Sequence, residues 1–298
     1  MQPKLSLSPV SISQCAFEDA FHVTAEAGFT GIGLRYNQLE DYLARGHTLK
    51  DVHDLLRRHG LVFTEAAFLA EWQFHGGVPL VCQRRRSGGH AEEPGLLRRK
   101  LQLFLERCEA FECANATAVP ALRETGDLAV AAEEFGALCD AARPYGVRLC
   151  LEFMGSAPQI RDLATARDVV TRAGRANGGV LIDTFLFHEG GSALADLHGV
   201  DIDKVFNVQL ADAKPLPPSR LDMLTDRLFP GEGTAPVAAI AATLATRGYA
   251  GWWTVELFNP EYATRDPAEI AGKAHASARA MLPETLPASR SSRLPAAQ

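Results

Sequence analysis

Short apolar runs alternate with longer segments of helical periodicity along most of this 298-residue chain, and few folds accept such an order. Eight runs rich in β-branched or aromatic residues are predicted to be strands, at 4–8, 31–36, 61–67, 116–119, 148–153, 179–184, 205–210 and 252–257. Strands that alternate with helices favour a parallel sheet. A (β/α)₈ barrel typically takes about 250 residues, so the chain is predicted to form an α/β fold with a single closed (β/α)₈ TIM barrel.

The ends of several helices can be read from capping residues. Thr48 and Asp51 have the spacing of a capping box, and Gly60 stands where a helix-terminating glycine is expected. Asp127 and Asp266 each precede an amphipathic segment and are predicted N-caps. No G-x-G-x-x-G motif follows the first predicted strand, which disfavours an open dinucleotide-binding sheet. We therefore expect no nucleotide cofactor.

Two segments interrupt the even spacing of the strands. One connects the third and fourth strands and contains the glycine-rich stretch 72–95, and the other connects the seventh and eighth. Both are expected to be loops over the catalytic face. The chain from 283 to 298 is rich in Pro, Ser and Ala and is predicted to be a disordered tail, which leaves 1–282 as the barrel.

Composition and charge exclude several classes of partner. The chain is 47% hydrophobic and 22% charged, as in ordinary globular proteins. Its net charge of −6 offers no general attraction to nucleic acid or to anionic lipid. Six cysteines without a C-x-x-C pair are interpreted as reduced thiols, and no apolar run is long enough for a membrane span. We expect a cytoplasmic protein that binds neither nucleic acid nor membrane.

Four strongly polar residues lie late in otherwise apolar strands of the second half. They are Glu152, Asp183, Gln209 and Glu256. In a barrel of this kind the active site lies at the carboxyl ends of the strands. A carboxylate buried alone would cost several kcal/mol or take up a proton, so several together require a cation. Any one of them could instead pair with an arginine or cap a helix. Their tandem placement favours an oxygen-rich site for one divalent ion, Mn²⁺, Mg²⁺ or Co²⁺.

Several segments resemble the xylose-isomerase-like barrel superfamily of sugar isomerases, epimerases and related lyases, and most of all its inosose (2-keto-myo-inositol) isomerases. They are 144–155 (PYGVRLCLEFMG), 181–192 (LIDTFLFHEGGS), 226–233 (DRLFPGEG), 255–262 (VELFNPEY) and, more weakly, 31–43 (GIGLRYNQLEDYL). The resemblance implies that Glu152, Asp183, Gln209 and Glu256 hold one divalent metal ion.

The chain departs from the family pattern at three places. Gln209 stands where sugar isomerases often have His, a substitution also familiar among the dehydratase branches. The third residue after Asp183 is Leu186 where a His is common, and only His188 follows. Gly33 replaces a frequent Glu on the second strand. The chemistry is therefore expected to be shared with the family while the substrate differs.

Four residues are candidates for substrate binding. The resemblance implies that Arg227 reaches substrate oxygens, although it could be a plain surface charge. His188 follows a predicted ligand in a glycine-rich segment, where the alternative is a loop histidine bonded to backbone. Trp72 and His75 lie after the third strand, where an aromatic residue could equally belong to the core.

These residues suggest metal-assisted proton transfer next to a carbonyl of a small polyhydroxy substrate. Glu152 and Glu256 are the candidate proton-transferring carboxylates. Isomerisation, epimerisation and β-elimination share this first step, so a sugar or cyclitol isomerase/epimerase is favoured and a metal-dependent dehydratase such as an inosose or 3-dehydroshikimate dehydratase is the near alternative. A non-catalytic sugar-binding protein and an abasic-site endonuclease remain as further readings. Apolar helix faces would allow a homo-oligomer.

Overall fold

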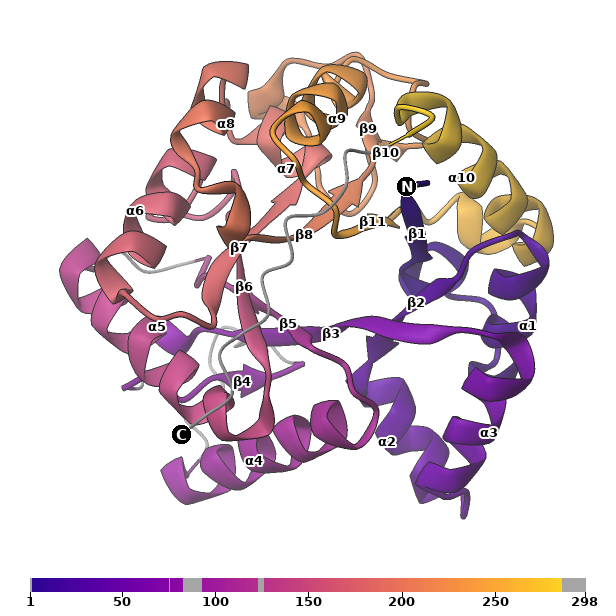
Figure 1. Cartoon of the computed structure of the whole chain (residues 1–298), viewed down its shortest axis with the longest axis horizontal. Helices are drawn as coiled ribbons and strands as arrows, with labels where there is room; N and C mark the ends of the chain where they lie inside the picture. The colour runs from indigo at the N-terminus through magenta and orange to yellow at the C-terminus, as the bar shows by residue number, and fades with distance from the viewer. Residues whose placement is uncertain (1, 75, 83–92, 123–125, 286–298) are drawn as a thin grey trace.

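Eight parallel strands form a closed cylinder surrounded by helices in the computed structural model, which describes residues 2–74, 76–82, 93–122 and 126–285 (Figure 1). The barrel strands are β1 (Lys4–Leu7), β2 (Gly31–Arg35), β3 (Val62–Ala70), β5 (Asn115–Val119), β6 (Arg148–Glu152), β7 (Gly178–Asp183), β8 (Val205–Leu210) and β11 (Trp252–Val255). Each pairs in parallel with the next, and β11 pairs with β1 to close the ring. The predicted TIM barrel is confirmed.

All eight predicted strands are present, with ends that differ by up to three residues. The largest difference is at β3, which continues to Ala70 because its last two residues pair with the short antiparallel strand β4 (Leu80–Val81). Most strand residues are buried on both faces, as parallel strands covered by helices require. This is why the strands appear in the sequence as nearly continuous apolar runs.

The helices begin and end at the predicted caps. Thr48 and Asp51 form a capping box at the start of α3, and Gly60 ends that helix in a left-handed conformation. Asp127 and Asp266 accept backbone N–H groups at the starts of α5 and α10. The α-helices are α1 (Phe17–Glu26), α2 (Tyr36–Ala44), α3 (Leu49–His59), α4 (Pro94–Ala110), α5 (Leu128–Ala142), α6 (Leu163–Ala173), α7 (Thr184–Glu189), α8 (Leu194–Gly199), α9 (Val237–Thr246) and α10 (Pro267–Met281).

The two long connections contain regular structure that the sequence did not predict. The stretch 72–95, expected as a loop, includes the 3₁₀ helix η2 (Trp72–Phe74), strand β4 and the start of α4. Its residues 83–92 lie outside the described residues, as do 286–298 of the predicted tail. The second connection carries a two-stranded antiparallel ladder, β9 (Asp212–Ala213) with β10 (Arg227–Leu228). The other 3₁₀ helices are η1 (Pro9–Ile12), η3 (Arg143–Tyr145), η4 (Ile202–Lys204), η5 (Pro218–Arg220) and η6 (Tyr262–Thr264).

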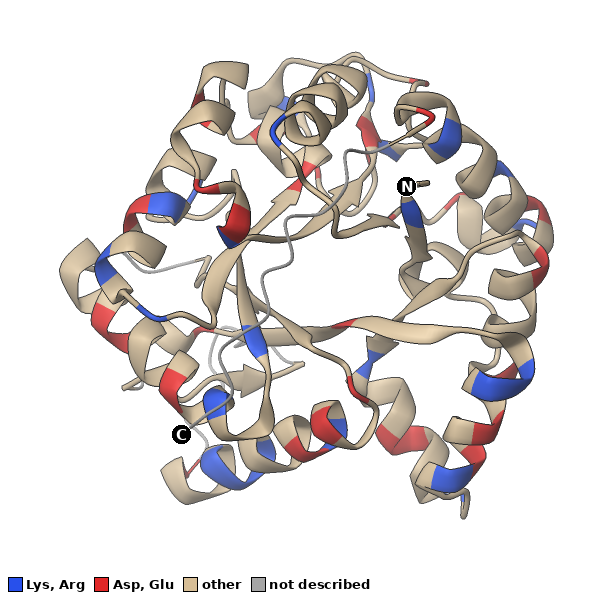
Figure 2. Ribbon diagram, in the orientation of Figure 1, with Lys and Arg blue, Asp and Glu red and all other residues tan. Residues whose placement is uncertain are grey.

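Basic and acidic residues are interspersed along the outer helices in the ribbon view of Figure 2. The largest apolar cluster joins the strands to the helices that cover them. All six cysteines are free thiols, four of them buried. No helix in the described part of the chain is both long and apolar enough to span a bilayer.

Candidate metal centre

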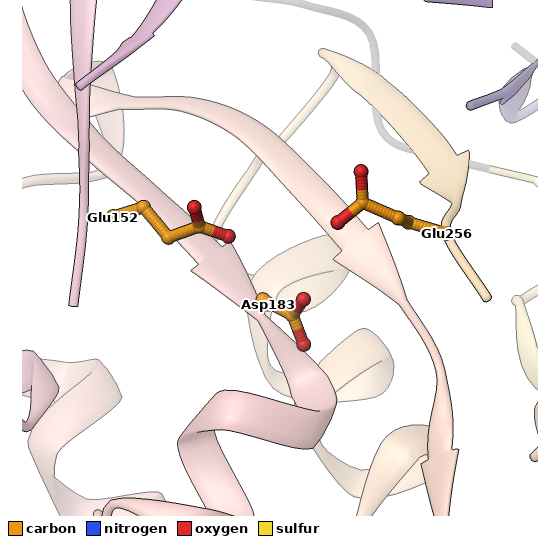
Figure 3. Close-up of side chains that lie close together, drawn as sticks. All are labelled: Glu152, Asp183 and Glu256. Atoms are coloured by element: carbon orange, nitrogen blue, oxygen red, sulfur yellow. The ribbon is translucent and has the colours of Figure 1, made fainter. Parts of the chain in front are cut away.

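Three of the four predicted ligands meet at the carboxyl ends of their strands. Glu152 is the last residue of β6, Asp183 is the last of β7, and Glu256 directly follows β11. One carboxylate oxygen from each lies within 4.8 Å of the others, and the three side chains point toward a common space (Figure 3). All three residues are buried, with 7%, 1% and 6% of their surface exposed, respectively. The convergence expected from the sequence is therefore present for these three.

Burial makes the ionised forms of these carboxyl groups unfavourable. Loss of solvent raises the pKa of Glu152 well above its ordinary value, and the charges of Glu256 and Asp183 raise it further. The pKa of Glu256 is also raised by burial, while Arg227 and a hydrogen bond from Ser8 oppose the rise. The Ser8 hydroxyl donates to Glu256 Oε1 at 3.0 Å. A cation placed among these oxygens would relieve the same penalty.

Asp183 is held by two different partners. Its Oδ1 accepts the backbone N–H groups of Phe185 and Leu186 at 2.7 and 3.0 Å, so the residue is also the N-cap of α7. Its Oδ2 accepts from Arg227 Nη1 at 2.6 Å. Each carboxylate oxygen offers two lone pairs, so Oδ1 is filled by its two donors and Oδ2 retains capacity for a further ligand. These contacts fix the orientation of the carboxylate.

Arg227 is a buried part of the site and not a surface charge. Only 1% of its surface is exposed, and its guanidinium lies 4.8 and 5.4 Å from the ring centres of Phe185 and Phe258. Besides Asp183 it bonds the carbonyl oxygen of Glu256 at 3.3 Å and, through Nε, that of Met223 at 3.2 Å. Contact with a substrate stays a prediction, because in this structure its partners are groups of the protein.

Gln209, the fourth predicted ligand, lies beside Asp183 in the β7–β8 register. Its Nε2 donates to both carboxylate oxygens of Glu65, at 3.2 and 3.1 Å. Its Oε1 is buried and has no hydrogen-bond partner in the structure. An acceptor of this kind is costly to bury unless a donor or a cation meets it.

Glu65 is a buried residue of the site that the sequence analysis missed. It lies within β3 and is 2% exposed. Burial and the charge of Glu256 raise its pKa to about 8, although hydrogen bonds from Gln209 and Asn207 favour the ionised form. The signal was available, because an acidic residue inside an apolar strand also singled out Glu152. Glu65 differs from the other site carboxylates in that its strand continues for five residues beyond it.

The donor set fits a divalent cation. Asp183 has Arg227 as counter-charge, but the site also contains the carboxyl groups of Glu65, Glu152 and Glu256. Arg35 is a further cation among the charges that lower the pKa of Glu65 and Glu256. Carboxylate and amide oxygens suit Mg²⁺ or Mn²⁺, whereas zinc sites in proteins usually include nitrogen or sulfur ligands.

The remaining predicted residues do not join this cluster through any described contact. Trp72 is fully buried and packs against Phe135 of α5, with ring centres 5.4 Å apart, so its contact is with the barrel's outer layer. His188 is half-buried on α7. His75 lies outside the described residues. A substrate role for any of the three stays a prediction.

A second missed residue, Glu189, ends α7. Burial raises its pKa to about 6, although Arg227 opposes the rise. Its carboxyl group lies against Gly155 after β6, and a hydrogen bond from the Gly155 backbone also opposes the rise in its pKa. Nothing in its sequence context distinguishes it from a surface glutamate.

Most of the chain is similar to enzymes of one barrel family. The family model described as "Xylose isomerase-like TIM barrel" matches residues 21–281. An inosose isomerase of Bacillus velezensis is 30% identical over 79% of this chain and 81% of its own length. A 3-dehydroshikimate dehydratase of Pseudomonas aeruginosa is 31% identical over 85% of this chain but only 38% of its own length.

Coverage is smaller for other relatives. An inosose isomerase of Halalkalibacterium halodurans is 39% identical, and the match spans 44% of that protein.

Among solved structures, the IolI protein crystallised with a zinc atom superposes with a TM-score of 0.81 at 24% identity, over 94% of this chain and 98% of that one. The structural likeness supports the fold, and the sequence matches indicate common ancestry with these enzymes. The chain belongs to the xylose isomerase-like TIM barrel family.

Proposed function

We propose that the protein is a divalent-metal-dependent isomerase that moves a proton next to the carbonyl of a polyhydroxy ketone of the inosose type. The observation that carries the proposal is the convergence of three buried carboxylates at the carboxyl ends of the strands. Gln209 pairs in register with one of them, Asp183, and its amide oxygen is buried without a hydrogen-bond partner. The inosose isomerase relative of Bacillus velezensis supports the choice of substrate class.

Glu152, Asp183, Gln209 and Glu256 would hold the metal. A bound divalent cation polarises a carbonyl and makes the adjacent C–H more acidic. Ser8 and Arg227 favour the ionised form of Glu256, so Glu256 Oε2 takes the proton. Glu152 lacks such a donor among the described residues and returns a proton. Delivery to the neighbouring carbon, together with transfer of the hydroxyl proton to the former carbonyl oxygen, completes isomerisation.

Dehydration is the second candidate, because the Pseudomonas aeruginosa dehydratase matches 85% of this chain. Both reactions begin by removing a proton next to a carbonyl. They differ in whether a β-hydroxyl group then leaves. The same proton-accepting carboxylate therefore serves both candidates.

The test uses the Mn²⁺-loaded full-length protein with an inosose, and separately with 3-dehydroshikimate, in D₂O. Isomerase activity predicts loss of the NMR signal of the hydrogen next to the carbonyl without a conjugated product. Dehydratase activity predicts growth of ultraviolet absorbance. Glu256→Gln should abolish exchange with either compound.

Absence of exchange with both compounds, in protein shown to bind one Mn²⁺ per chain, would overturn the proton-transfer proposal. Tight binding of an inosose that persists unchanged after metal removal would instead favour a sugar-binding protein.

A further inference from the structure

Glu65 and Gln209 meet across the barrel although they lie on β3 and β8, strands that are not neighbours in the sheet. Gln209 Nε2 donates to both oxygens of Glu65, and Asn207 Nδ2, two residues earlier on β8, donates to Glu65 Oε2. Glu65, Asn207 and Gln209 are at most 2% exposed. One carboxylate thus binds the donor ends of two amides.

This pairing decides which way the Gln209 amide faces. The ionised Glu65 carboxylate only accepts hydrogen bonds, so a flipped amide would bring Oε1 against it, where two acceptors repel each other. The observed orientation leaves Oε1 buried, without a partner, on the residue that pairs in register with Asp183. Only a cation or a donor can satisfy that atom.

The neighbouring strand leaves room for the arrangement. Gly33 lies on β2, the strand that pairs with β3. A Cβ atom there would lie 3.2 Å from Pro9 Cδ and 3.7 Å from Glu65 Oε1. A longer acidic side chain would therefore crowd the carboxylate that binds Gln209.

We propose that Glu65 is a positioning residue that turns the amide oxygen of Gln209 toward the metal. The proposal rests on the proposed metal-dependent function. It explains how a glutamine, which has no fixed preference for its oxygen end, can serve in place of a histidine. Glu65 itself acts through Gln209 and need not touch the ion.

Two simpler roles must be separated from this one. Glu65 could attract a cation through its charge alone, or it could only support the barrel. Glu65→Asp tests attraction by charge alone. It keeps the charge but shortens the side chain by one methylene and so withdraws it from Gln209. Glu65→Gln removes charge and keeps size. The Gln209→Ala background removes the group through which Glu65 is proposed to act.

The experiment measures Mn²⁺ affinity by calorimetry on the full-length chain after removal of metal with a chelator. Glu65→Gln and Glu65→Asp are each made with Gln209 present and in Gln209→Ala. Thr117→Val is the matched control, since it replaces a buried strand hydroxyl that has no hydrogen-bond partner. Circular dichroism and melting temperature report folding, and the visible spectrum of the Co²⁺ form reports ligand geometry.

Both Glu65 variants should weaken Mn²⁺ binding at least tenfold with Gln209 present, as is typical for residues that orient a ligand, and less than threefold in Gln209→Ala. Both should change the Co²⁺ spectrum, whereas Thr117→Val should not. Equal losses in the two backgrounds, or an effect of Glu65→Gln but not Glu65→Asp, would overturn the proposal. If Glu65→Gln does not fold, the Glu65→Asp pair alone decides. Failure of the wild-type chain to bind Mn²⁺ would instead refute the proposed function.

Discussion

Arg227 is the residue on which the orientation of Asp183 most depends. Its guanidinium joins Asp183 Oδ2 to the carbonyl oxygen of Glu256, so one side chain connects β7 with the end of β11. It is enclosed by the rings of Phe185 and Phe258. Lysine could supply the charge but not the planar group that also bonds the Met223 carbonyl oxygen through Nε and lies near the aromatic rings.

We expect Arg227→Met to lower the free energy of unfolding of the metal-free protein by about 3–5 kcal/mol, because it leaves the Asp183 carboxylate buried without its counter-charge. Arg227→Lys should cost less. Urea unfolding measures both. Arg172→Met, which breaks an exposed pair with Asp168, is the control and should have little effect. Similar small losses in all three variants would contradict a structural role for Arg227.

At the scale of elements, the connection between β8 and β11 is organised by Asp212. This buried residue of β9 accepts the backbone N–H groups of Ala213, Gly231 and Ala235 at 2.8, 2.9 and 2.8 Å. The chain also passes close to itself here, since a Cβ atom on Gly233 would lie 2.0 Å from the carbonyl oxygen of Ala213. The β9–β10 ladder that carries Arg227 is thereby joined to the loop that follows it.

Asp212→Ala should lower the free energy of unfolding by about 2 kcal/mol or more, because each unpartnered buried N–H costs about 1–3 kcal/mol. It should also speed amide hydrogen exchange at Gly231 and Ala235. Asp222→Ala, at an exposed turn in the same connection, is the control. Unchanged exchange at those two amides would show that Asp212 does not hold the loop.

The local elements were predictable because their signals are local. The cap residues Thr48, Asp127 and Asp266 act within a few positions, and each barrel strand is a self-contained apolar run. The pairing of Glu65 with Gln209 was not predictable, since it depends on the stagger of strands 144 positions apart in sequence. The partners of Arg227 likewise follow from the β9–β10 ladder, whose two-residue strands leave no pattern in the sequence.

At the scale of the whole molecule, the barrel places several carboxyl groups with raised pKa in one interior. A group whose folded pKa lies above its unfolded value contributes stability at low pH, and this contribution is lost as the pH rises toward the folded pKa. Burial raises the pKa of Glu152, Glu256 and Glu65, the last to about 8. The metal-free protein should therefore lose stability between pH 6.5 and 8.

Urea unfolding with a chelator present measures this loss, which amounts to about 1.4 kcal/mol per pH unit for each carboxyl group that is still protonated in the folded state. Lowered pKa values of His59 and His275 act in the opposite direction, mainly below this range. Glu152→Gln should reduce the slope. Saturating Mn²⁺ should abolish or reverse it, because metal binding strengthens as its ligands ionise. Constant or rising stability of the metal-free wild type would contradict the assignment.

The hydrogen bond from Ser8 to Glu256 joins residues from opposite ends of the chain. During synthesis on the ribosome, β11 emerges last of the barrel strands. Until it does, the nascent chain lacks both that hydrogen bond and the β1–β11 pairing. Capture of the proposed cation should consequently begin only after β11 has emerged, which would make the ion a reporter of barrel closure.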